Sequence, residues 1–458
     1  MSKQLVSVNP FDQQEIARYD TDSPQAIETK LRQAAKAFGE WKILAPQERA
    51  AYIRTLAGHL LRNKQYMAQI ATDEMGKPIS QAVAEVEKCA ASLKYYADNG
   101  PQMLAPEVVN TEAGKAFVTY QPLGSVLAIM PWNFPYWQAY RALAPILTGG
   151  NAMLLKHASN VTGCALAMEK IAQEAGLPQG LFQVLLVSSA DTEAIMADSR
   201  IHAVTFTGST VAGRKVAALA GAHLKKQVLE LGGSDAYVVL ADADIELAAA
   251  TCVQSRMTNT GQSCIAAKRF VVVEAIADEF TKMVVEKMKA LTWGNPNVEG
   301  MQAGPMARMD LRNELHQQVQ DSVAKGAVIL CGGQLPEGLG AFYPPTVLAN
   351  VKKGMPAYDE ELFGPVAAVI AAKDEAEAIA IANDTEFGLG GALFTKDMAK
   401  AEAVATTMLE AGSIFVNDFV KSDARLPFGG IKQSGYGREL SYFGLREFVN
   451  VKTVSMQW

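Results

Sequence analysis

The chain has 458 residues, of which 49% are hydrophobic and 20% charged. This length predicts about two to four domains, and the composition excludes disordered, collagen-like and coiled-coil chains. Because 42 basic residues face 48 acidic ones and no basic block occurs, we expect neither nucleic acid nor an anionic membrane as a partner. No apolar run approaches the ~18 residues of a spanning helix, and the start lacks a secretory signal.

Cysteine and histidine residues are few and scattered. The five cysteines, at positions 89, 164, 252, 264 and 331, form no CxxC pair. This usage favours a reducing compartment, so we expect a cytoplasmic protein without a disulfide framework. The five histidines form no HxxxH motif or Cys/His cluster, and we therefore predict no metal site.

The first ~100 residues are predicted to be mainly helical. Ser23-Pro24 places an N-cap before a first-turn proline and predicts a helix to about residue 38. A second helix is predicted from Pro46, and a long third one from Pro78 that ends before Gly100-Pro101.

From about residue 115 the pattern changes to short β-type runs that alternate with helical stretches. Strands are predicted at 116–120, 125–130, 152–156, 182–186, 203–206 and 227–231. Helices are predicted near 136–148, 162–175, 191–198 and 210–222. This alternation predicts a parallel sheet with helices on both faces, and such sheets bind ligands at the carboxyl ends of their strands.

A second alternating series follows Gly232-Gly233, which we take as the break between two α/β blocks. Strands are predicted at 236–240, 269–274, 328–330, 366–371, 391–394 and 413–416. Helices are predicted near 244–258, 277–291, 307–325, 374–383 and 397–409. The tail, 448–455, is β-like, and we expect it to pair with another subunit; pairing within its own chain is the alternative.

Cys264 is the first candidate for chemistry. It lies in Gly261-Gln262-Ser263-Cys264, a turn between a predicted helix and a predicted strand. A thiol on such a turn can face a cleft, and its thiolate form attacks carbonyl carbons. The alternative is a buried apolar cysteine, which we retain for the other four.

Glu230 is the second candidate, within the apolar sequence Val228-Leu229-Glu230-Leu231 before Gly232-Gly233. A carboxylate in an apolar strand is costly to bury, and a raised pKa would suit a general base. The two glycines permit a close approach by a ligand. A salt-bridged glutamate at a strand end is the alternative.

Asn133 is the third candidate, in Pro131-Trp132-Asn133-Phe134-Pro135 at the end of an apolar strand. Two prolines fix the backbone around a side-chain amide that can donate to an oxyanion. The alternative role is capping of the turn between strand and helix.

Residues 206–213, Phe-Thr-Gly-Ser-Thr-Val-Ala-Gly, form a candidate phosphate site. They follow a predicted strand and open a predicted helix, so backbone N–H groups and the helix dipole can hold a phosphate. The segment matches neither GxGxxG nor the Walker A motif, and an ordinary N-cap is the alternative. Lys156 lies at the end of a predicted strand, where its ammonium can donate hydrogen bonds to ribose hydroxyls. The alternative is a solvent-exposed lysine at a strand end.

Six motifs together resemble the aldehyde dehydrogenase superfamily over essentially the whole chain. They are Pro-Trp-Asn-Phe-Pro, Phe-Thr-Gly-Ser-Thr, Leu-Glu-Leu-Gly-Gly, Gly-Gln-Ser-Cys, Glu-Leu-Phe-Gly-Pro from residue 361 and Pro-Phe-Gly-Gly-Ile-Lys from residue 427. They occur in the family's order, and the spacing of 34 residues from Glu230 to Cys264 also matches.

The resemblance implies an α/β fold of two doubly wound parallel-sheet domains and a small β element for oligomerisation. The implied dinucleotide-binding domain covers 1–103 and 123–232, and the catalytic domain covers 233–432. Residues 104–122 and 433–458 would form the oligomerisation or bridging element of a homo-oligomer, a dimer or a tetramer.

The resemblance also implies the roles of the candidate residues. Cys264 would attack the aldehyde, Asn133 and the Cys264 N–H would stabilise the oxyanion, and Glu230 would activate water to hydrolyse the thioester. The implied nicotinamide-cofactor residues are Trp132, Lys156, Ser159, Gly208, Ser209, Glu361 and Phe363.

The cofactor preference depends on one departure from the family. Many members carry Glu three residues after the lysine, where this chain has Ser159, so repulsion of a 2′-phosphate is absent. His157, in place of the usual proline, is expected to crowd the same space. We therefore predict NAD as the better cofactor with NADP usable.

Substrate choice is predicted to depend on Arg141 and Ser422. Within the family, succinate-semialdehyde dehydrogenases place Arg eight residues after the asparagine, and Arg can bind a carboxylate through a bidentate fork. An interhelical salt bridge is the alternative for Arg141. A second family arginine is Thr258 here, for which we suggest Arg425 as compensation. Tyr136, Trp137 and Phe419 are expected to supply apolar walls.

We therefore expect an NAD(P)-dependent, non-acylating dehydrogenase that oxidises succinate semialdehyde. Oxidation of a neutral aldehyde or of glutarate semialdehyde is the alternative within the same chemistry. A CoA-acylating relative is disfavoured because Glu230 supplies a hydrolytic base. A catalytically silent binding or structural protein on this fold is the alternative from another class.

Overall fold

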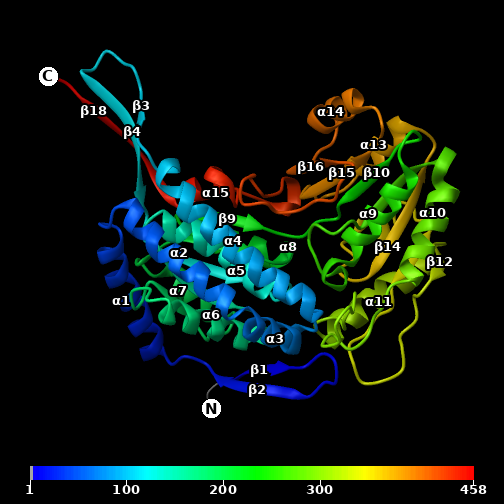
Figure 1. Ribbon diagram of the computed structural model, residues 1–458, viewed down its shortest axis with the longest axis horizontal. Helices are drawn as coiled ribbons and strands as arrows, with labels where there is room; N and C mark the ends of the chain where they lie inside the picture. Colours follow the sequence, from blue (N-terminus) through cyan, green and yellow to red (C-terminus); the bar gives the residue numbers. More distant parts are fainter. Residues whose placement is uncertain (1–3) are drawn as a thin grey trace.

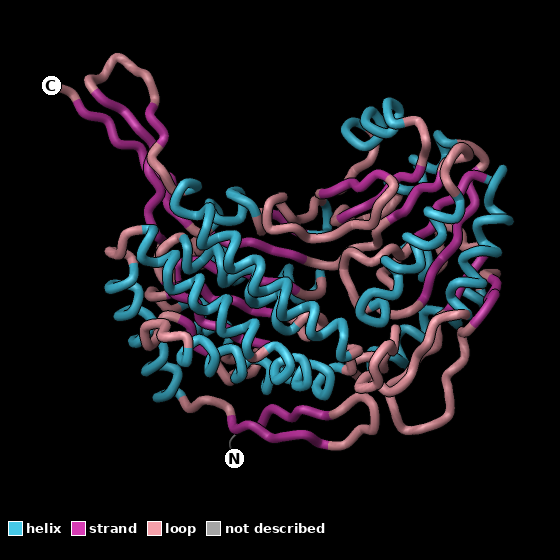
Figure 2. The backbone as a smooth tube through the Cα atoms, in the orientation of Figure 1, coloured by secondary structure: helices cyan, strands magenta, loops and turns pink. Residues whose placement is uncertain are grey.

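Two β-sheets with helices on both faces form the body of the molecule (Figure 1). The computed structural model describes residues 4–458. A two-stranded hairpin lies at the N-terminus and a three-stranded antiparallel sheet extends from the body as an arm (Figure 2). The predicted α/β class with two wound sheets is confirmed.

The first sheet has six strands in the order β17-β9-β8-β5-β6-β7. Its parallel strands are β5 (Ser125–Met130), β6 (Ala152–His157), β7 (Phe182–Val184), β8 (Ile201–Thr207) and β9 (Lys226–Glu230). The sixth strand, β17 (Gly435–Tyr436), pairs antiparallel with β9. The connecting helices are α5 (Pro135–Thr148), α6 (Thr162–Glu174), α7 (Thr192–Ala197) and α8 (Thr210–Ala222), with the 3-10 turn η1 (Ser159–Val161) before α6.

Both faces of this sheet are buried, which explains its continuous apolar strands. Along β5, Val126 and Ala128 enter the core formed with α4 (Ile79–Met103) and α5, whereas Leu127 and Ile129 enter a second core on the opposite face. Successive strand residues alternate between faces, so a strand covered on both sides has no polar face to present.

The second sheet has seven strands in the order β12-β13-β14-β11-β10-β15-β16, and only β12 is antiparallel. The strands are β10 (Ala236–Val239), β11 (Arg269–Val273), β12 (Val328–Cys331), β13 (Thr346–Ala349), β14 (Val366–Ala372), β15 (Gly390–Phe394) and β16 (Ser413–Val416). The helices are α9 (Ile245–Met257), α10 (Glu274–Lys289), α11 (Met309–Ala324), α12 (Pro356–Asp359), α13 (Glu375–Asn383) and α14 (Met398–Thr407), and η2 (Thr258–Gly261) follows α9. The chain passes from the first sheet to the second between β9 and β10, through Gly232-Gly233.

The N-terminal segment contains more elements than predicted. A hairpin of β1 (Gln4–Val8) and β2 (Glu15–Asp20) precedes α1 (Pro24–Trp41) and α2 (Pro46–Arg62), and α3 (Lys64–Met75) stands before α4. Helix α4 also continues through Gly100-Pro101, contrary to the prediction. Proline removes one hydrogen bond of a helix, and the packing of Gly100 against the Thr148 side chain keeps this last turn in place.

The C-terminal strand pairs along one edge within its own chain, as the intrachain alternative has it. Strand β18 (Val449–Met456) lies antiparallel to all of β4 (Lys115–Pro122), which also pairs with β3 (Glu107–Val108). The other part of the predicted bridging segment 433–458 packs on the first domain. There η3 (Lys432–Ser434) leads into β17 at the sheet edge, and α15 (Ser441–Glu447) contacts α4 and α5.

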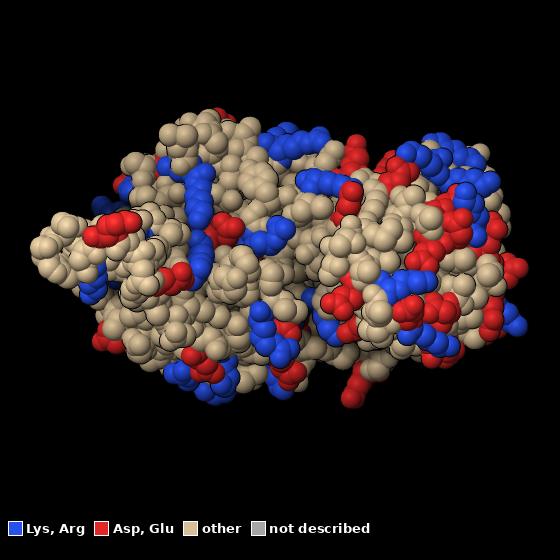
Figure 3. Space-filling model, turned by 90° about the horizontal axis from the view of Figure 1, so that it is seen from above, with Lys and Arg blue, Asp and Glu red and all other residues tan. Residues whose placement is uncertain are grey.

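The outer surface carries both charge signs. On the face that Figure 3 shows, lysines and arginines are interspersed with aspartates and glutamates rather than gathered into one basic field. Within residues 4–458, no helix combines the length and the apolar character that crossing a bilayer requires. The same residues contain no group of His, Cys, Asp and Glu side chains arranged to hold a metal ion.

Candidate active site

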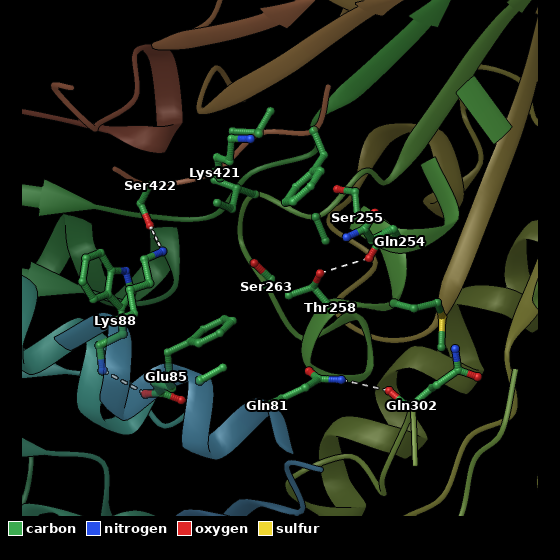
Figure 4. Close-up of a pocket in the computed structure, with 18 of the residues that line it drawn as sticks. Gln81, Glu85, Lys88, Gln254, Ser255, Thr258, Ser263, Gln302, Lys421 and Ser422 are labelled. Carbon is green, nitrogen blue, oxygen red and sulfur yellow. Dashed lines mark hydrogen bonds between the residues drawn. The ribbon is translucent and has the colours of Figure 1, made fainter. Parts of the chain in front are cut away.

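A cavity of about 800 Å³ opens between the two sheet domains (Figure 4). Helices α4 and α5 line it from the first domain, and α9 lines it from the second. The turn at 263–266 and the loop at 419–422 complete the walls. Cys264 is part of this lining, so its thiol faces a cleft rather than a sealed core.

Three consecutive left-handed residues form the turn before Cys264. Asn259, Thr260 and Gly261 have φ of 56°, 55° and 76°. This conformation is strained for Asn and more so for the β-branched Thr, and it is kept only where surrounding contacts impose it. Thr260 Oγ1 accepts from Gly304 N at 3.0 Å, and Asn259 Nδ2 donates to the Asn133 carbonyl at 2.6 Å. These bonds fix the path of the chain that presents the thiol.

Burial dominates the electrostatics of the Cys264 thiol. It raises the pKa of Cys264 to about 12, against the opposing effects of Lys268 and Arg141. Lys268 is buried, and its Nζ donates to the carbonyls of Ser263 and Cys264 at 2.7 and 2.5 Å. The lysine therefore holds the backbone of Cys264 in place and brings a positive charge to the site.

Glu230 is buried without a single hydrogen-bond donor. Its residue is 2% exposed, and neither carboxylate oxygen has a partner within the described part of the chain. Burial and the nearby Glu439 carboxylate raise the pKa of Glu230 well above its usual range. Its charge also raises the pKa of Cys264, so the two groups interact. An unsatisfied buried carboxylate is costly in a structural role and suits a base that receives a proton.

Asn133 follows the end of β5 and contacts the turn that carries Cys264. Its Nδ2 donates to the Gln262 carbonyl at 3.1 Å, and its Oδ1 has no partner among the described residues. Because an amide carries two N–H hydrogens, one of them stays available for an oxyanion. Asn133 thus contacts the turn that carries Cys264, and the charge of Glu230 acts on the Cys264 thiol, although only Cys264 of the three lines the cavity.

Arg141 lines the cavity but also forms the salt bridge that was its alternative role. Its Nε is ion-paired with the buried Glu439, and its guanidinium lies 4.8 Å from the Phe428 ring centre. Nη2 contacts Thr207 Oγ1 at 3.4 Å, and within residues 4–458 no acceptor lies in hydrogen-bond range of Nη1. Glu439 thus neutralises the charge of Arg141 through Nε, while Nη1 of the guanidinium has no hydrogen-bond acceptor in the described part of the chain.

The other predicted substrate residues divide into two groups. Ser422 and Phe419 line the cavity, as does Trp137. Tyr136 does not: its ring is fully buried in the first core and its hydroxyl donates to the Met67 carbonyl at 2.8 Å, so its prediction as a tunnel wall is corrected. The suggested compensation by Arg425 also fails, because that side chain is 74% exposed and pairs with Asp423.

The predicted phosphate segment lies at the N-terminus of α8. Ser209 is the N-cap, and its Oγ accepts from Ala212 N at 3.4 Å. The amide of Gly208 donates to the Glu230 carbonyl at 3.0 Å, which ties this turn to the strand of the candidate base. A Cβ on Gly213 would lie 2.4 Å from Leu231, so glycine permits the close packing of α8 on the sheet. The first amides of a helix in this position can hold a phosphate.

Lys156 and Ser159 lie near the carboxyl end of β6, at the same edge of the sheet. Burial lowers the pKa of Lys156, and no acceptor contacts its ammonium among the described residues. His157 does not crowd this space as expected. It is buried, its Nε2 lies 2.8 Å from the Pro135 carbonyl, and burial lowers its pKa to about 4. The argument from His157 for ranking NAD above NADP is thereby removed.

Glu361, Phe363 and Trp132 face one another across the domain boundary. Glu361 accepts from Gly233 N at 3.1 Å and lies 3.2 Å from Lys268 Nζ. The Trp132 and Phe363 rings meet edge to face at 5.7 Å. A Cβ at Gly232 would come within 2.6 Å of Glu361, so the glycines keep this side of the cleft open. Lys156, which has no hydrogen-bond acceptor among the described residues, the N-terminus of α8 and this glycine-lined side of the cleft together fit a dinucleotide.

Sequence reasoning missed several residues of the site. Glu439 was assigned to the bridging tail, and its pairing with Arg141 arises only from tertiary packing. Lys268 carried a weak signal, a lysine directly before the apolar strand β11. Lys88, which lines the cavity from α4, is indistinguishable in sequence from a solvated helical lysine.

Two wound sheet domains, a cysteine in the cleft between them and a buried glutamate without hydrogen-bond donors among residues 4–458 make up the candidate site. Residues 1–454 match the aldehyde dehydrogenase family, and the chain belongs to that family.

Named relatives align over nearly their full lengths. The chain is 49% identical to the succinate semialdehyde dehydrogenase [NAD(P)+] Sad of Escherichia coli K12, covering 98% of this chain and 97% of that protein. It is 45% identical to a probable succinate-semialdehyde dehydrogenase [NADP(+)] of Synechocystis, covering 98% and 99%. The succinic semialdehyde dehydrogenase of Streptococcus pyogenes, solved with NADP+, superposes with a TM-score of 0.97 at 35% identity, covering 99% of this chain and all of that one.

Proposed function

We propose that this enzyme oxidises succinate semialdehyde to succinate with NAD or NADP and hydrolyses its acyl intermediate with water. The observation that carries the proposal is that Arg141 and Ser422 line the same cavity as Cys264. An aldehyde with a distal carboxylate can therefore place its two ends against groups of matching chemistry. The named substrates of the relatives support the same assignment.

Cys264 forms the carbon–sulfur bond to the aldehyde carbon as its thiolate, its proton passing to solvent, and the carbonyl π bond opens to an oxyanion. The second N–H of Asn133 and the Cys264 amide donate to this oxyanion; losing one such donor typically raises a barrier by ~3–4 kcal/mol. A bound nicotinamide dinucleotide would supply the hydride acceptor that conversion of the thiohemiacetal to a thioester requires.

Glu230 takes a proton from water as the water attacks the thioester, which releases the acid and restores the thiol. Because burial and Glu439 raise the pKa of Glu230, its ionised form is a stronger base than an exposed carboxylate.

We assign the dinucleotide to the cleft between α8 and the second domain. Gly208 and Ser209 would hold its pyrophosphate, and Lys156 and Ser159 its adenosine ribose. Glu361 would hold the nicotinamide ribose, with Trp132 and Phe363 beside the ring. Ser159 carries no charge that would repel a 2′-phosphate, which supports use of both cofactors.

The assembly and the compartment are also proposed here. The exposed edge of β18, with Val451 on its surface, supports a dimer or tetramer built through the arm of β3, β4 and β18. Five free cysteines support a cytoplasmic location.

A steady-state panel tests the substrate. It compares succinate semialdehyde, glutarate semialdehyde and butanal, each with NAD and with NADP. The proposal predicts the highest kcat/KM for succinate semialdehyde, by at least about tenfold over butanal, the value of one charge-assisted contact. A higher kcat/KM for butanal would contradict it and favour the neutral-aldehyde alternative.

A further inference from the structure

Lys88 lines the cavity from α4. It projects from the middle of α4, and its Nζ donates to Ser422 Oγ at 2.7 Å across the gap to the 419–422 loop (Figure 4). The ammonium also lies 4.2 Å from the Trp137 ring centre, a distance that permits a cation–π contact. Hydroxyl and ring together fix the position of the ammonium.

The other charged groups around the cavity already have partners. Glu85 accepts from two backbone amides at 2.8 Å and pairs with Lys77, and Arg141 pairs with Glu439. The remaining pairs are Lys421 with Asp418, Lys287 with Glu246, and Arg425 with Asp423. Within the described residues, no carboxylate lies in salt-bridge range of Lys88. Among these residues its ammonium contacts only a neutral hydroxyl and an aromatic face, and Glu85 and Asp423 act on its charge from beyond salt-bridge range.

Burial and the nearby Arg141 lower the pKa of Lys88 to about 8. Its ammonium form therefore still predominates at pH 7. A partly buried cation without a counter-ion is unfavourable, and an anion placed against it relieves the cost. An anion that binds at this wall of the cavity is therefore stabilised by the Lys88 ammonium.

The Ser422 hydroxyl adds a second hydrogen-bond donor at the same position. Since its oxygen accepts from Lys88, its own hydrogen is available to donate to a further acceptor. A carboxylate at this point can accept from the ammonium and the hydroxyl together. Thr258, where the family resemblance leads one to expect a second arginine, instead donates its hydroxyl to the Gln254 carbonyl at 3.0 Å.

We propose that Lys88 is a specificity-determining residue whose ammonium, together with the Ser422 hydroxyl, binds the carboxylate of the aldehyde substrate. Lys88 thus supplies, from α4, the second cation that position 258 lacks. This inference rests on the proposed function, because it presumes a substrate that carries a carboxylate. A purely structural Lys88 would only tether α4 to the 419–422 loop, and it would affect all aldehydes alike.

The test compares Lys88→Met, Lys88→Arg and the control Lys287→Met with succinate semialdehyde and with butanal. Lys287 lines the same cavity, but its ammonium is already paired with Glu246. For Lys88→Met we expect KM for succinate semialdehyde to rise about 10- to 100-fold, with kcat and the butanal constants within about threefold. Lys88→Arg should recover part of this loss, and Lys287→Met should change neither substrate by more than about threefold. Retained butanal turnover shows that each variant is folded.

Succinate inhibition of butanal oxidation separates this inference from the proposed function. We expect the inhibition constant of succinate to rise at least about tenfold in Lys88→Met. If the wild-type enzyme prefers butanal while succinate inhibition still depends on Lys88, the proposed substrate fails and the carboxylate site stands. Equal losses for both aldehydes, or succinate inhibition that is absent or independent of Lys88, overturn the inference.

Discussion

Two buried glutamates, in two regions of the first domain, show how this chain separates structure from chemistry. Glu74, on α3, is 1% exposed and accepts from Ser7 Oγ at 2.5 Å and from the amides of Gly163 and Cys164 at 2.8 and 2.9 Å. Glu230, on β9, is 2% exposed and accepts from none of the described residues. Burial raises the pKa of both, so burial and pKa do not distinguish them.

The number of donors does distinguish them. Glu74 joins the N-terminal hairpin, α3 and the first turn of α6, and its three donors compensate for much of its lost hydration. Glu230 has no such donors among the described residues, and its charge acts on the Cys264 thiol. From this difference we predict that Glu230 belongs to the reacting region, whereas Glu74 joins structural elements.

The comparison predicts its largest effect at Cys264. Cys264→Ala should lower aldehyde turnover by at least about 10³-fold, because no other group forms the covalent intermediate. The measurement is the rise in absorbance of the reduced nicotinamide, with dinucleotide binding as the control for folding. Substantial residual turnover would remove Cys264 as the nucleophile.

Glu230→Gln should give the next largest effect. We expect a loss of about 10²- to 10³-fold in steady-state turnover, because the amide cannot take a proton from water. Thermal stability should change little, since the wild-type carboxylate has no donors to lose. Unchanged turnover would assign Glu230 to the structural group with Glu74.

The pH dependence of thiol alkylation tests the electrostatics of the reacting region. The pKa of Cys264 is raised to about 12, so its reactive thiolate is scarce at neutral pH and increases as pH rises. In the free enzyme, iodoacetamide inactivation should therefore quicken about tenfold per pH unit between pH 7 and 10. A plateau below pH 9 would show that Lys268 and Arg141 outweigh burial.

Glu74→Gln should have the smallest effect on catalysis and a measurable one on stability. The amide cannot accept from all three donors, which should destabilise the fold by about 1–3 kcal/mol and lower Tm. Activity per folded molecule should stay within about twofold, because the donors of Glu74 are Ser7, Gly163 and Cys164, none of which lines the cavity. A loss of activity as large as that of Glu230→Gln would contradict a purely structural role for Glu74.

Local sequence patterns predicted most of the fold because buried strands and amphipathic helices carry their own periodicity. Strands β5 and β16 and helix α8 have the predicted limits. The short, partly exposed strands β1 and β2 lack an apolar run and were missed. The partner of β18 could not be predicted, because an edge strand shows its need for pairing but not which chain supplies it.

The site was predictable where chemistry lies in contiguous motifs and unpredictable where distant segments meet. Cys264, Glu230 and Asn133 lie in short motifs, and in the structure Asn133 contacts the turn that carries Cys264. Lys88 and Ser422 are 334 residues apart, so no local signal connects them. Tyr136 was misplaced because its hydroxyl finds the Met67 carbonyl in the core, a tertiary contact that helical spacing cannot reveal.

The most direct test of the account is a rapid-mixing experiment on Glu230→Gln with succinate semialdehyde, followed by acid quenching and peptide mass spectrometry. The account predicts a burst of reduced cofactor close to one equivalent per site and an acyl group on the peptide that contains Cys264. A variant that shows neither burst nor adduct, or that carries the acyl group on another residue, would contradict the division of labour between Cys264 and Glu230.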